Sequence, residues 1–256
     1  MKTTMSIPAL ERTIRILDLL TQAQQPLTGA EITKTLDLPR STAHGLLNHL
    51  AAAGLIRKTD ERHFALGARL MYWANGFLEQ QDVIAEFYQA IQHISELEPY
   101  TLTLSTLSND QVIYLACRNS KSPLGFEFRM GMQLPAVLTA TGKIMLSYLS
   151  DEELASLITR FPPPYTANSV RNHSELAREL AQIRRQGYAV DNGQLRLGMH
   201  CFGVAVTDHT RQARFGIAAS LIQQEANEAT CRQLVAGLKK LSNRLSTALG
   251  GNMTAA

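Results

Sequence analysis

A segment near the N-terminus carries side chains that can hydrogen-bond nucleic acid, at the spacing of one helix face. These side chains, and the glycine among them, are Arg40, Ser41, Thr42, His44, Gly45 and Asn48. Hydroxyl, amide and guanidinium groups at the start of a helix suit phosphates and base edges in a DNA major groove. The alternative is an ordinary solvated polar face, because most amphipathic helices carry one. The elements around the segment decide between the two interpretations.

The helices that would position this segment are marked by their caps. Thr28 and Glu31 have the spacing of a capping box, in which each side chain satisfies a free backbone donor at a helix start. That helix is expected to run to about Leu36. Pro39 then suits the first position of the next helix, and Gly54 is placed to end it. An apolar pattern of helical period precedes both, so three short helices are predicted.

A basic hairpin follows the third helix. Strands at 55–59 and 63–66 flank the polar turn 60–62. No acidic residue lies between Asp37 and Asp60. Two helices joined by a tight turn and followed by a hairpin are the order of a winged helix-turn-helix, so we favour DNA binding. The predicted contacts to DNA are Thr28, Arg40, Ser41, Thr42, His44, Asn48, Arg57, Lys58 and Arg62.

The segment 67–80 predicts a connector helix with more large apolar side chains than a small domain can cover. These are Leu70, Met71, Trp73, Phe77 and Leu78. An exposed apolar surface of this kind marks an interaction site, so we expect the connector to pair with a second copy of the chain.

Residues 81–256 predict an α+β domain. Helices are expected over 82–98, 141–149, 151–159, 174–186 and 225–249, and strands over 101–107, 111–117, 125–130, 188–191, 201–207 and 214–221. Because the strands are grouped on either side of helices, we expect one mostly antiparallel sheet covered by helices.

Two of the predicted strands present small residues on one face. Ala218 and Ser220 share a face by the period-two rule, and Cys201 lies on the matching face of the preceding strand. A space there, beside a helix start at Thr141 and Gly142, suits a small anion because free N–H groups and the helix dipole favour negative charge. The alternative is that the small residues merely allow a helix to pack closely.

The chain resembles the IclR family of bacterial transcription regulators. The matching stretches are 38–44, 46–47, 54–56 and 64–67 for the winged helix, and 131–149 and 186–220 for the C-terminal part. The resemblance implies a C-terminal domain similar in fold to GAF domains, which binds a small metabolite that alters operator binding. It also implies a homodimer or a homotetramer.

The resemblance adds residues to the predicted effector site. Asp191, Cys201 and Ser220 match positions at which family members contact effectors, and Ala218 replaces a second contacting serine. With the helix start, the predicted effector site is Ala140, Thr141, Gly142, Asp191, Cys201, Ala218 and Ser220. Because no cluster of arginines is present to balance several charges, we expect a small carboxylate with an apolar body.

Two positions depart from the family pattern. Gly45 stands where the recognition helix usually has an arginine, which removes a contact to DNA and costs about 1 kcal/mol of helix stability relative to alanine. Val137 replaces a histidine of the loop before Gly142, so we expect effector recognition to differ in detail.

Composition sets limits on the class of protein. A chain of 256 residues that is 45% hydrophobic can form one large domain or two modest ones. Its apolar runs are too short for a membrane span, and the first nine residues do not resemble a secretory signal. Three cysteines without close spacing argue against a disulfide framework or a zinc ribbon, so a reducing cytoplasm is expected. The net charge of +3 is too small to indicate nucleic-acid binding alone.

No cofactor, metal or catalytic set is predicted. The segment 137–143 lacks the first glycine of a P-loop, and Ile144 stands where a Ser or Thr would ligate magnesium. His200 and Cys201 are neighbours on a strand, so they point to opposite faces and cannot share a proton.

The sequence therefore predicts a ligand-responsive regulator, a repressor or an activator, that binds double-stranded operator DNA. Its parts are a winged helix at 1–66, a connector at 67–80 and an effector-binding domain at 81–256. One alternative is a cytoplasmic metabolite-converting enzyme with an accessory winged-helix interaction module. Another is an architectural DNA binder that responds to no ligand.

Overall fold

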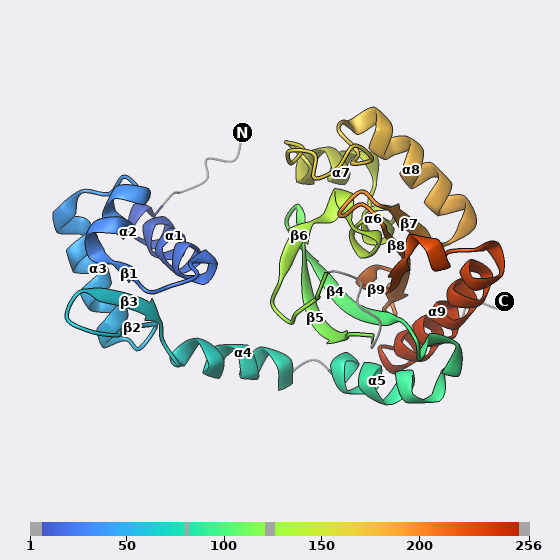
Figure 1. The fold of residues 1–256 in the computed structure, drawn as a ribbon, viewed down its shortest axis with the longest axis horizontal. Helices are drawn as coiled ribbons and strands as arrows, with labels where there is room; N and C mark the ends of the chain where they lie inside the picture. Colours follow the sequence, from blue (N-terminus) through green and yellow to red (C-terminus); the bar gives the residue numbers. More distant parts are fainter. Residues whose placement is uncertain (1–6, 80–81, 121–125, 251–256) are drawn as a thin grey trace. The chain divides into compact units, whose positions relative to one another are not determined.

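The computed structural model describes residues 7–79, 82–120 and 126–250. The chain forms two compact units that divide between residues 80 and 81 (Figure 1). Within the described ranges, no helix is both long and apolar enough to cross a bilayer.

The N-terminal unit combines helices with a small antiparallel sheet (Figure 1). Its first elements are α1 (Pro8–Gln22), β1 (Leu27–Thr28), α2 (Gly29–Thr35), α3 (Arg40–Ala52), β2 (Ile56–Lys58) and β3 (His63–Leu66). The strands lie in the order β1-β3-β2. This is a winged helix-turn-helix, as predicted. Strand β1 was not predicted because its two residues carry no periodic signal; it forms through pairing of Leu27 with Phe64.

The start of α2 is fixed by a capping box, as predicted. Thr28 Oγ1 accepts the Glu31 N–H at 3.2 Å, and Glu31 Oε2 accepts the Thr28 N–H at 2.7 Å, so the capping box is confirmed. Pro39 is the N-cap of α3 and not its first helical residue. The buried core of this unit is Ile16, Leu20, Ile32, Leu38, Ala43, Leu47, Leu50, Ile56 and Phe64. Leu46 of α3 is only partly buried.

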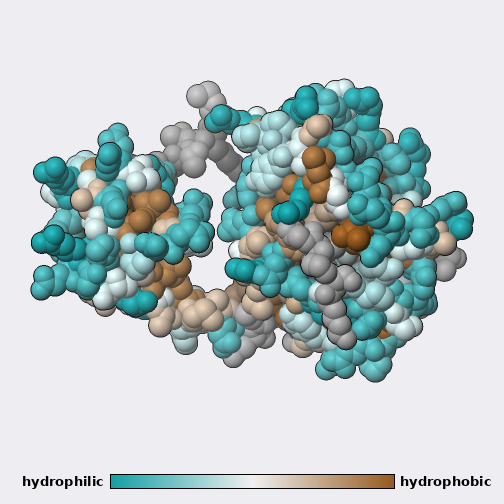
Figure 2. All heavy atoms as spheres, viewed as in Figure 1, coloured by the Kyte–Doolittle hydropathy of each residue, from teal (hydrophilic) through white to brown (hydrophobic). Residues whose placement is uncertain are grey.

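Helix α4 (Arg69–Glu79) follows the wing and exposes large apolar side chains. Met71, Tyr72, Trp73 and Phe77 are between 45% and 77% exposed, and the side chain of Leu78 lies outside the described part. Figure 2 shows apolar atoms on the surface of α4. This helix therefore presents apolar area that the described part of the chain does not cover.

The C-terminal unit is built on one antiparallel sheet with the strand order β6-β5-β4-β9-β8-β7 (Figure 1). Its strands are β4 (Thr101–Ser108), β5 (Gln111–Arg118), β6 (Gln133–Pro135), β7 (Ala189–Asn192), β8 (Met199–Thr207) and β9 (Ala213–Ile222). Its helices are α5 (Asp82–Ala90), α6 (Ala140–Leu146), α7 (Asp151–Leu157), α8 (His173–Gln186) and α9 (Glu228–Ala248). The chain is therefore α+β, as predicted.

Helices cover both faces of this sheet. On one face, bulky side chains such as Phe202, Val204 and Ile217 pack against α5 and α9. On the other, Cys201 and Ala218 belong to the core that α6 and α8 complete. The alternation of bulky and small residues predicted for β8 and β9 is therefore confirmed.

The strand predicted over 125–130 is wrong where the structure describes it. Residues 126–129 have no regular structure, and Gly125 lies outside the described residues. Phe126 and Phe128 lie two residues apart, as inward-facing residues of a strand would. Their two rings contact each other edge to face, with centroids 4.9 Å apart, and both pack against the core. Their backbone, however, pairs with no strand. The edge strand beside β5 is β6 instead.

The helix predicted over 82–98 is interrupted. Helix α5 ends at Ala90, and two short 3-10 turns at 91–93 and 95–97 follow. The extended backbone at Ile94 separates the two turns. Ile94 and Leu97 are both buried, so core packing prevails here over the continuous helical pattern.

Candidate DNA-binding face and effector pocket

Helix α3 buries its leucines and exposes the polar face predicted to bind DNA. Ser41, His44 and Asn48 are exposed, and Arg40 is exposed in the first turn. Thr42 is half-buried. Asn48 Nδ2 lies 3.3 Å from His44 Nδ1, so a hydrogen bond holds these two side chains together on the helix surface.

The wing supplies exposed cations. Arg57 and Lys58 of β2 and Arg62 of the turn are all exposed. The carboxylate of Asp60 accepts the backbone N–H groups of Arg62 at 2.8 Å and His63 at 2.9 Å. These bonds, with one from the His63 side chain, lower the pKa of Asp60 to about 2. The carboxylate of Asp60 is therefore held by hydrogen bonds within the turn itself.

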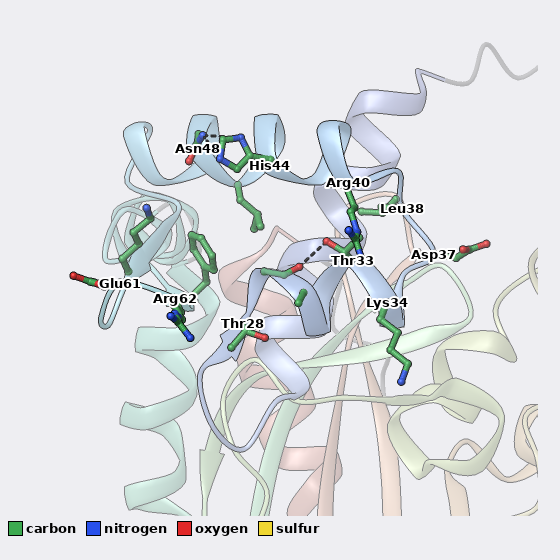
Figure 3. Close-up of a pocket in the computed structure, with 15 residues that line it drawn as sticks. Thr28, Thr33, Lys34, Asp37, Leu38, Arg40, His44, Asn48, Glu61 and Arg62 are labelled. Atoms are coloured by element: carbon green, nitrogen blue, oxygen red, sulfur yellow. Dashed lines mark hydrogen bonds between the residues drawn. The ribbon is translucent and has the colours of Figure 1, made fainter.

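A groove of about 980 Å³ runs between α2, α3 and the wing. It gathers six of the predicted DNA contacts, namely Thr28, Arg40, His44, Asn48, Lys58 and Arg62. Figure 3 shows the side chains of α3 along one side of this groove, with Arg62 across from them and Thr28 at the start of α2. Residues from separate parts of the sequence thus form one basic and polar surface.

Three predicted contacts lie outside this groove. Ser41, Thr42 and Arg57 do not line it. Lys34 of α2 does line it, and was not predicted because a single exposed lysine carries no sequence signal. The acidic residues Asp37 and Glu61 also line the groove, so its charge is mixed (Figure 3).

In the C-terminal unit, α6 packs very closely on β8 and β9. A Cβ added to Gly203 would lie 2.6 Å from the Ala140 carbonyl oxygen, and one added to Gly216 would lie 2.8 Å from that of Thr141. Only glycine fits at such distances. Close helix packing, the alternative given above, therefore accounts for the small residues at 203 and 216, and the space beside Cys201, Ala218 and Ser220 is small.

What remains between α6 and the sheet is a cavity of about 10 Å³, roughly the room for one water. Its walls are Thr103, Tyr114, Phe128, Thr139, Ala140, Thr141, Asp191, Leu195, Cys201, Ala218 and Ser220. All predicted effector residues except Gly142 are in this set. The strands and the helix start thus bring together residues that are far apart in the sequence.

The helix start differs from the prediction. Helix α6 begins at Ala140, with Thr139 as its N-cap. The Gly142 N–H donates to Thr139 Oγ1 at 3.0 Å, so it is not free for an anion. Gly142 also packs against the backbone of Ala136, where an added Cβ would lie 2.2 Å from the carbonyl oxygen. Its role is therefore structural.

Asp191 contributes a carboxyl group to the cavity wall. Its Oδ1 accepts the Gln194 N–H at 2.6 Å, whereas its Oδ2 is buried without a partner among the described residues. Burial raises the pKa of Asp191 to about 6, although Lys143 and the backbone N–H groups of Gln194 and Leu195 act in the opposite direction. The side chain can therefore exchange a proton near neutral pH.

Lys143 of α6 is fully buried and is held by groups outside the cavity lining. Its ammonium donates to Glu179 Oε2 at 2.8 Å and to the Val190 carbonyl at 2.6 Å. Glu179 also accepts from Gln194 Nε2 at 2.7 Å. The ion pair between Lys143 and Glu179, which are 36 residues apart in the sequence, compensates the buried positive charge and links α6 to α8.

The thiol of Cys201 is not an activated nucleophile. Burial raises its pKa far above the ordinary value, and Ser220 Oγ donates to its sulfur at 3.1 Å. His200 stacks on Phe202 at 4.9 Å on the opposite face of the sheet. The two adjacent residues therefore cannot exchange a proton, as predicted.

Two other predictions concern this unit. Val137, expected to alter effector recognition, is buried in the core and lines a different cleft of about 280 Å³ beside the loop at Pro162 and Pro163. It does not line the cavity at Asp191. No group of three His, Cys, Asp or Glu side chains in the described residues is placed to hold a metal ion.

Family models match both units. Residues 9–60 match the IclR helix-turn-helix domain, and residues 75–247 match the C-terminal domain of bacterial IclR transcriptional regulators. The crystal structure of the Agobacterium tumefaciens repressor BlcR is 43% identical, covers 96% of this chain and 99% of that one, and has a TM-score of 0.64. The regulator XynR of Escherichia coli is 27% identical over 246 residues, which are 95% of this chain and 98% of XynR.

A third relative was solved with a small acid. It is an IclR homologue from Microbacterium hydrocarbonoxydans complexed with 4-hydroxybenzoate, 19% identical, with a TM-score of 0.76 over 93% of this chain and 99% of that one. At this identity the likeness shows the fold alone.

The winged helix, the antiparallel sheet of the second unit and these matches define a transcription regulator with a DNA-binding and an effector-binding domain. The family model for the second domain covers well over half of the chain. The chain therefore belongs to the IclR family.

Proposed function

We propose that this regulator binds operator DNA through α3 and the wing, and that a small carboxylate in the C-terminal cavity changes this binding. Residues 1–66 would form the DNA-binding domain, 67–80 the connector and 81–256 the effector-binding domain. The protein would act in the cytoplasm, with no catalytic step.

The observation that carries the DNA proposal is the groove between α2, α3 and the wing. Arg40 and Asn48 offer donors at the N-terminal half and the middle of α3, where base edges are within reach in a major groove. Lys58 and Arg62 offer cations for phosphates on the wing. Ser41, Thr42 and Arg57 would then contact the backbone at the margin of the same surface.

The cavity at Asp191 supports a small effector with one polar end. Hydroxyl groups and the Asp191 carboxyl lie beside apolar walls formed by Ala218, Leu195 and Phe128. The space holds only one water-sized group, so we expect Phe128 and Leu195 to shift when the body of the ligand enters. The bound 4-hydroxybenzoate of the Microbacterium relative is a carboxylate of this general kind.

The exposed side chains of α4 support a homodimer or a homotetramer. Trp73 and Phe77 lie four residues apart, so they share one helix face, and both are nearly half exposed. Pairing of α4 between two chains would cover this surface and present two α3 helices to two half-sites.

One experiment separates this proposal from the enzyme alternative. The full chain is titrated onto DNA from its own upstream region at several salt concentrations, and small acids are incubated with it and followed for turnover. We expect specific binding that weakens steeply with salt and no turnover. Conversion of an acid without specific DNA binding would favour the enzyme, and DNA binding that no acid changes would favour the architectural binder.

A further inference from the structure

The cavity of the C-terminal unit contains one carboxyl group whose second oxygen is unsatisfied. Asp191 is 1% exposed, and only its Oδ1 is bonded, to the N–H groups of Gln194 and Leu195. Its Oδ2 is buried without a partner among the described residues. A buried acceptor without a partner is costly, so this oxygen marks a place for a proton or a ligand group.

Among the described residues, no cation lines the same cavity. The described side chains that form its walls include no lysine, arginine or histidine. The nearby ammonium of Lys143 is engaged by Glu179 and by the Val190 carbonyl. Lys143 and Glu179 compensate each other, so an ionised Asp191 gives the buried cluster a net charge of about −1.

Among the described residues, the titratable groups around Asp191 supply no positive charge that is not already paired. They come from the elements packed around it: Tyr114 of β5, Lys143 of α6, Glu179 of α8 and Cys201 of β8. Burial raises the pKa of both Tyr114 and Cys201 above their ordinary values, so both are neutral at pH 7. An ionised ligand carboxylate next to an ionised Asp191 would therefore meet a like charge without compensation.

We propose that the effector carboxylate binds beside Asp191 together with one proton, which Asp191 holds and shares with the ligand. This rests on the proposed function, because it takes a carboxylate as the effector. Protonation turns Oδ2 from an acceptor without a partner into a donor, and an O–H to carboxylate bond is short and strong. The charge balances: the site holds one ionised carboxyl before binding and one after it, and one proton comes from solvent.

This mechanism predicts a specific dependence of effector affinity on pH. The pKa of Asp191 is about 6 in the ligand-free protein. Below that pH the proton is already present and affinity is constant, whereas above it affinity falls about tenfold per pH unit. From pH 5.5 to 7.5 the loss is about 25-fold. Small carboxylic acids titrate near pH 4 to 5, so the ligand itself stays largely ionised over this range.

The test is calorimetric titration of the full chain with butyrate and benzoate and with their neutral amides, butyramide and benzamide. Each is measured at pH 5.5 and 7.5, and in two buffers of different ionisation heat, which counts the protons taken up. We expect an acid that binds to take up close to one proton at pH 7.5 and to bind about 25-fold more tightly at pH 5.5. The amides should show neither effect.

Asp191→Asn provides the matched variant, because its amide donates a hydrogen bond without needing a proton. We expect it to bind the acid at pH 7.5 about as tightly as the parent chain does at pH 5.5, with no proton uptake. Ser220→Ala is the control: it removes a hydroxyl from the same cavity and should keep the pH dependence. The proton count on the parent chain stands even if Asp191→Asn fails to fold.

Two results would overturn the inference, and they differ in what else they affect. An acid that binds equally well at both pH values without proton uptake would exclude the shared proton but leave the carboxylate effector intact. Failure of both acids to bind at pH 5.5, where the site is protonated, would overturn the shared proton together with the carboxylate class of effector.

Discussion

Replacing Gly45 with arginine should strengthen both the fold of the N-terminal unit and its binding to DNA. Gly45 lies in the interior of α3, next to the exposed His44 and one turn before Asn48. A Cβ added at this position meets no atom within 4 Å, so a side chain can be added without strain. The Gly45 carbonyl oxygen lies 2.9 Å from Nδ1 of the His49 side chain, and both variants keep this carbonyl.

The magnitudes follow from helix propensity and from charge. Gly→Ala or Gly→Arg in a helix interior gains about 1 kcal/mol, which raises the melting temperature of a domain of this size by about 4–8 °C. A new cation at the DNA surface neutralises about one more phosphate, which steepens the slope of log affinity against log salt by about 0.9. Gly45→Ala is the matched control, because it gains the same helix stability without adding a positive charge.

The assays are calorimetric melting of the full chain and fluorescence anisotropy on upstream DNA at several salt concentrations. Both variants should melt higher in the first unit, and only Gly45→Arg should bind more tightly with a steeper salt slope. A melting temperature that falls in Gly45→Ala would refute the open helix surface at 45. Equal salt slopes for Gly45→Arg and Gly45→Ala would refute the placement of this face against DNA.

Three further predictions follow from the N-terminal unit. Arg40→Ala and Asn48→Ala should each weaken specific DNA binding by about 1–3 kcal/mol without lowering the melting temperature, and unchanged affinity in both would contradict the assignment of α3. Trp73→Ser on α4 should shift the chain toward monomer in sedimentation at micromolar concentration, and a parent chain that is already a monomer would exclude the pairing. Thr28→Ala should lower stability by about 1 kcal/mol through loss of the cap. Hydrogen bonds from the backbone and side chain of Thr28 lower the pKa of Glu31, so the stability that these two bonds contribute is present above pH 4.5 and is lost as the pH falls through the lowered pKa. The difference in melting temperature between the parent chain and Thr28→Ala should therefore shrink from pH 6 to pH 3 without vanishing, because Thr28 Oγ1 still accepts the Glu31 N–H, and a constant difference would contradict it.

Features that depend on local sequence could be predicted. The capping box at Thr28 is complete within four residues, and the polar face of α3 follows from a helical period of a few turns. The alternation of β8 and β9 is also local, and it placed Cys201 and Ser220 on the correct face.

Features that depend on how distant segments pack could not be predicted. The size of the cavity at Asp191 depends on how closely α6 approaches Gly203 and Gly216, which no local pattern encodes. The burial of Lys143 depends on Glu179, which lies 36 residues away. Alternating apolar residues do not always indicate a strand: Phe128 packs into the core as a strand residue would, but its backbone pairs with no strand.

The central claim is that an acid bound by the C-terminal unit changes how the N-terminal unit binds DNA. Footprinting of the full chain on its own upstream DNA, with and without an acid shown by calorimetry to bind, tests this most directly. We expect protection of two half-sites whose centres lie about one helical turn or a multiple apart, and a clear change in protection when the acid is added. No protected site, or a footprint that a bound acid leaves unchanged, would contradict the account.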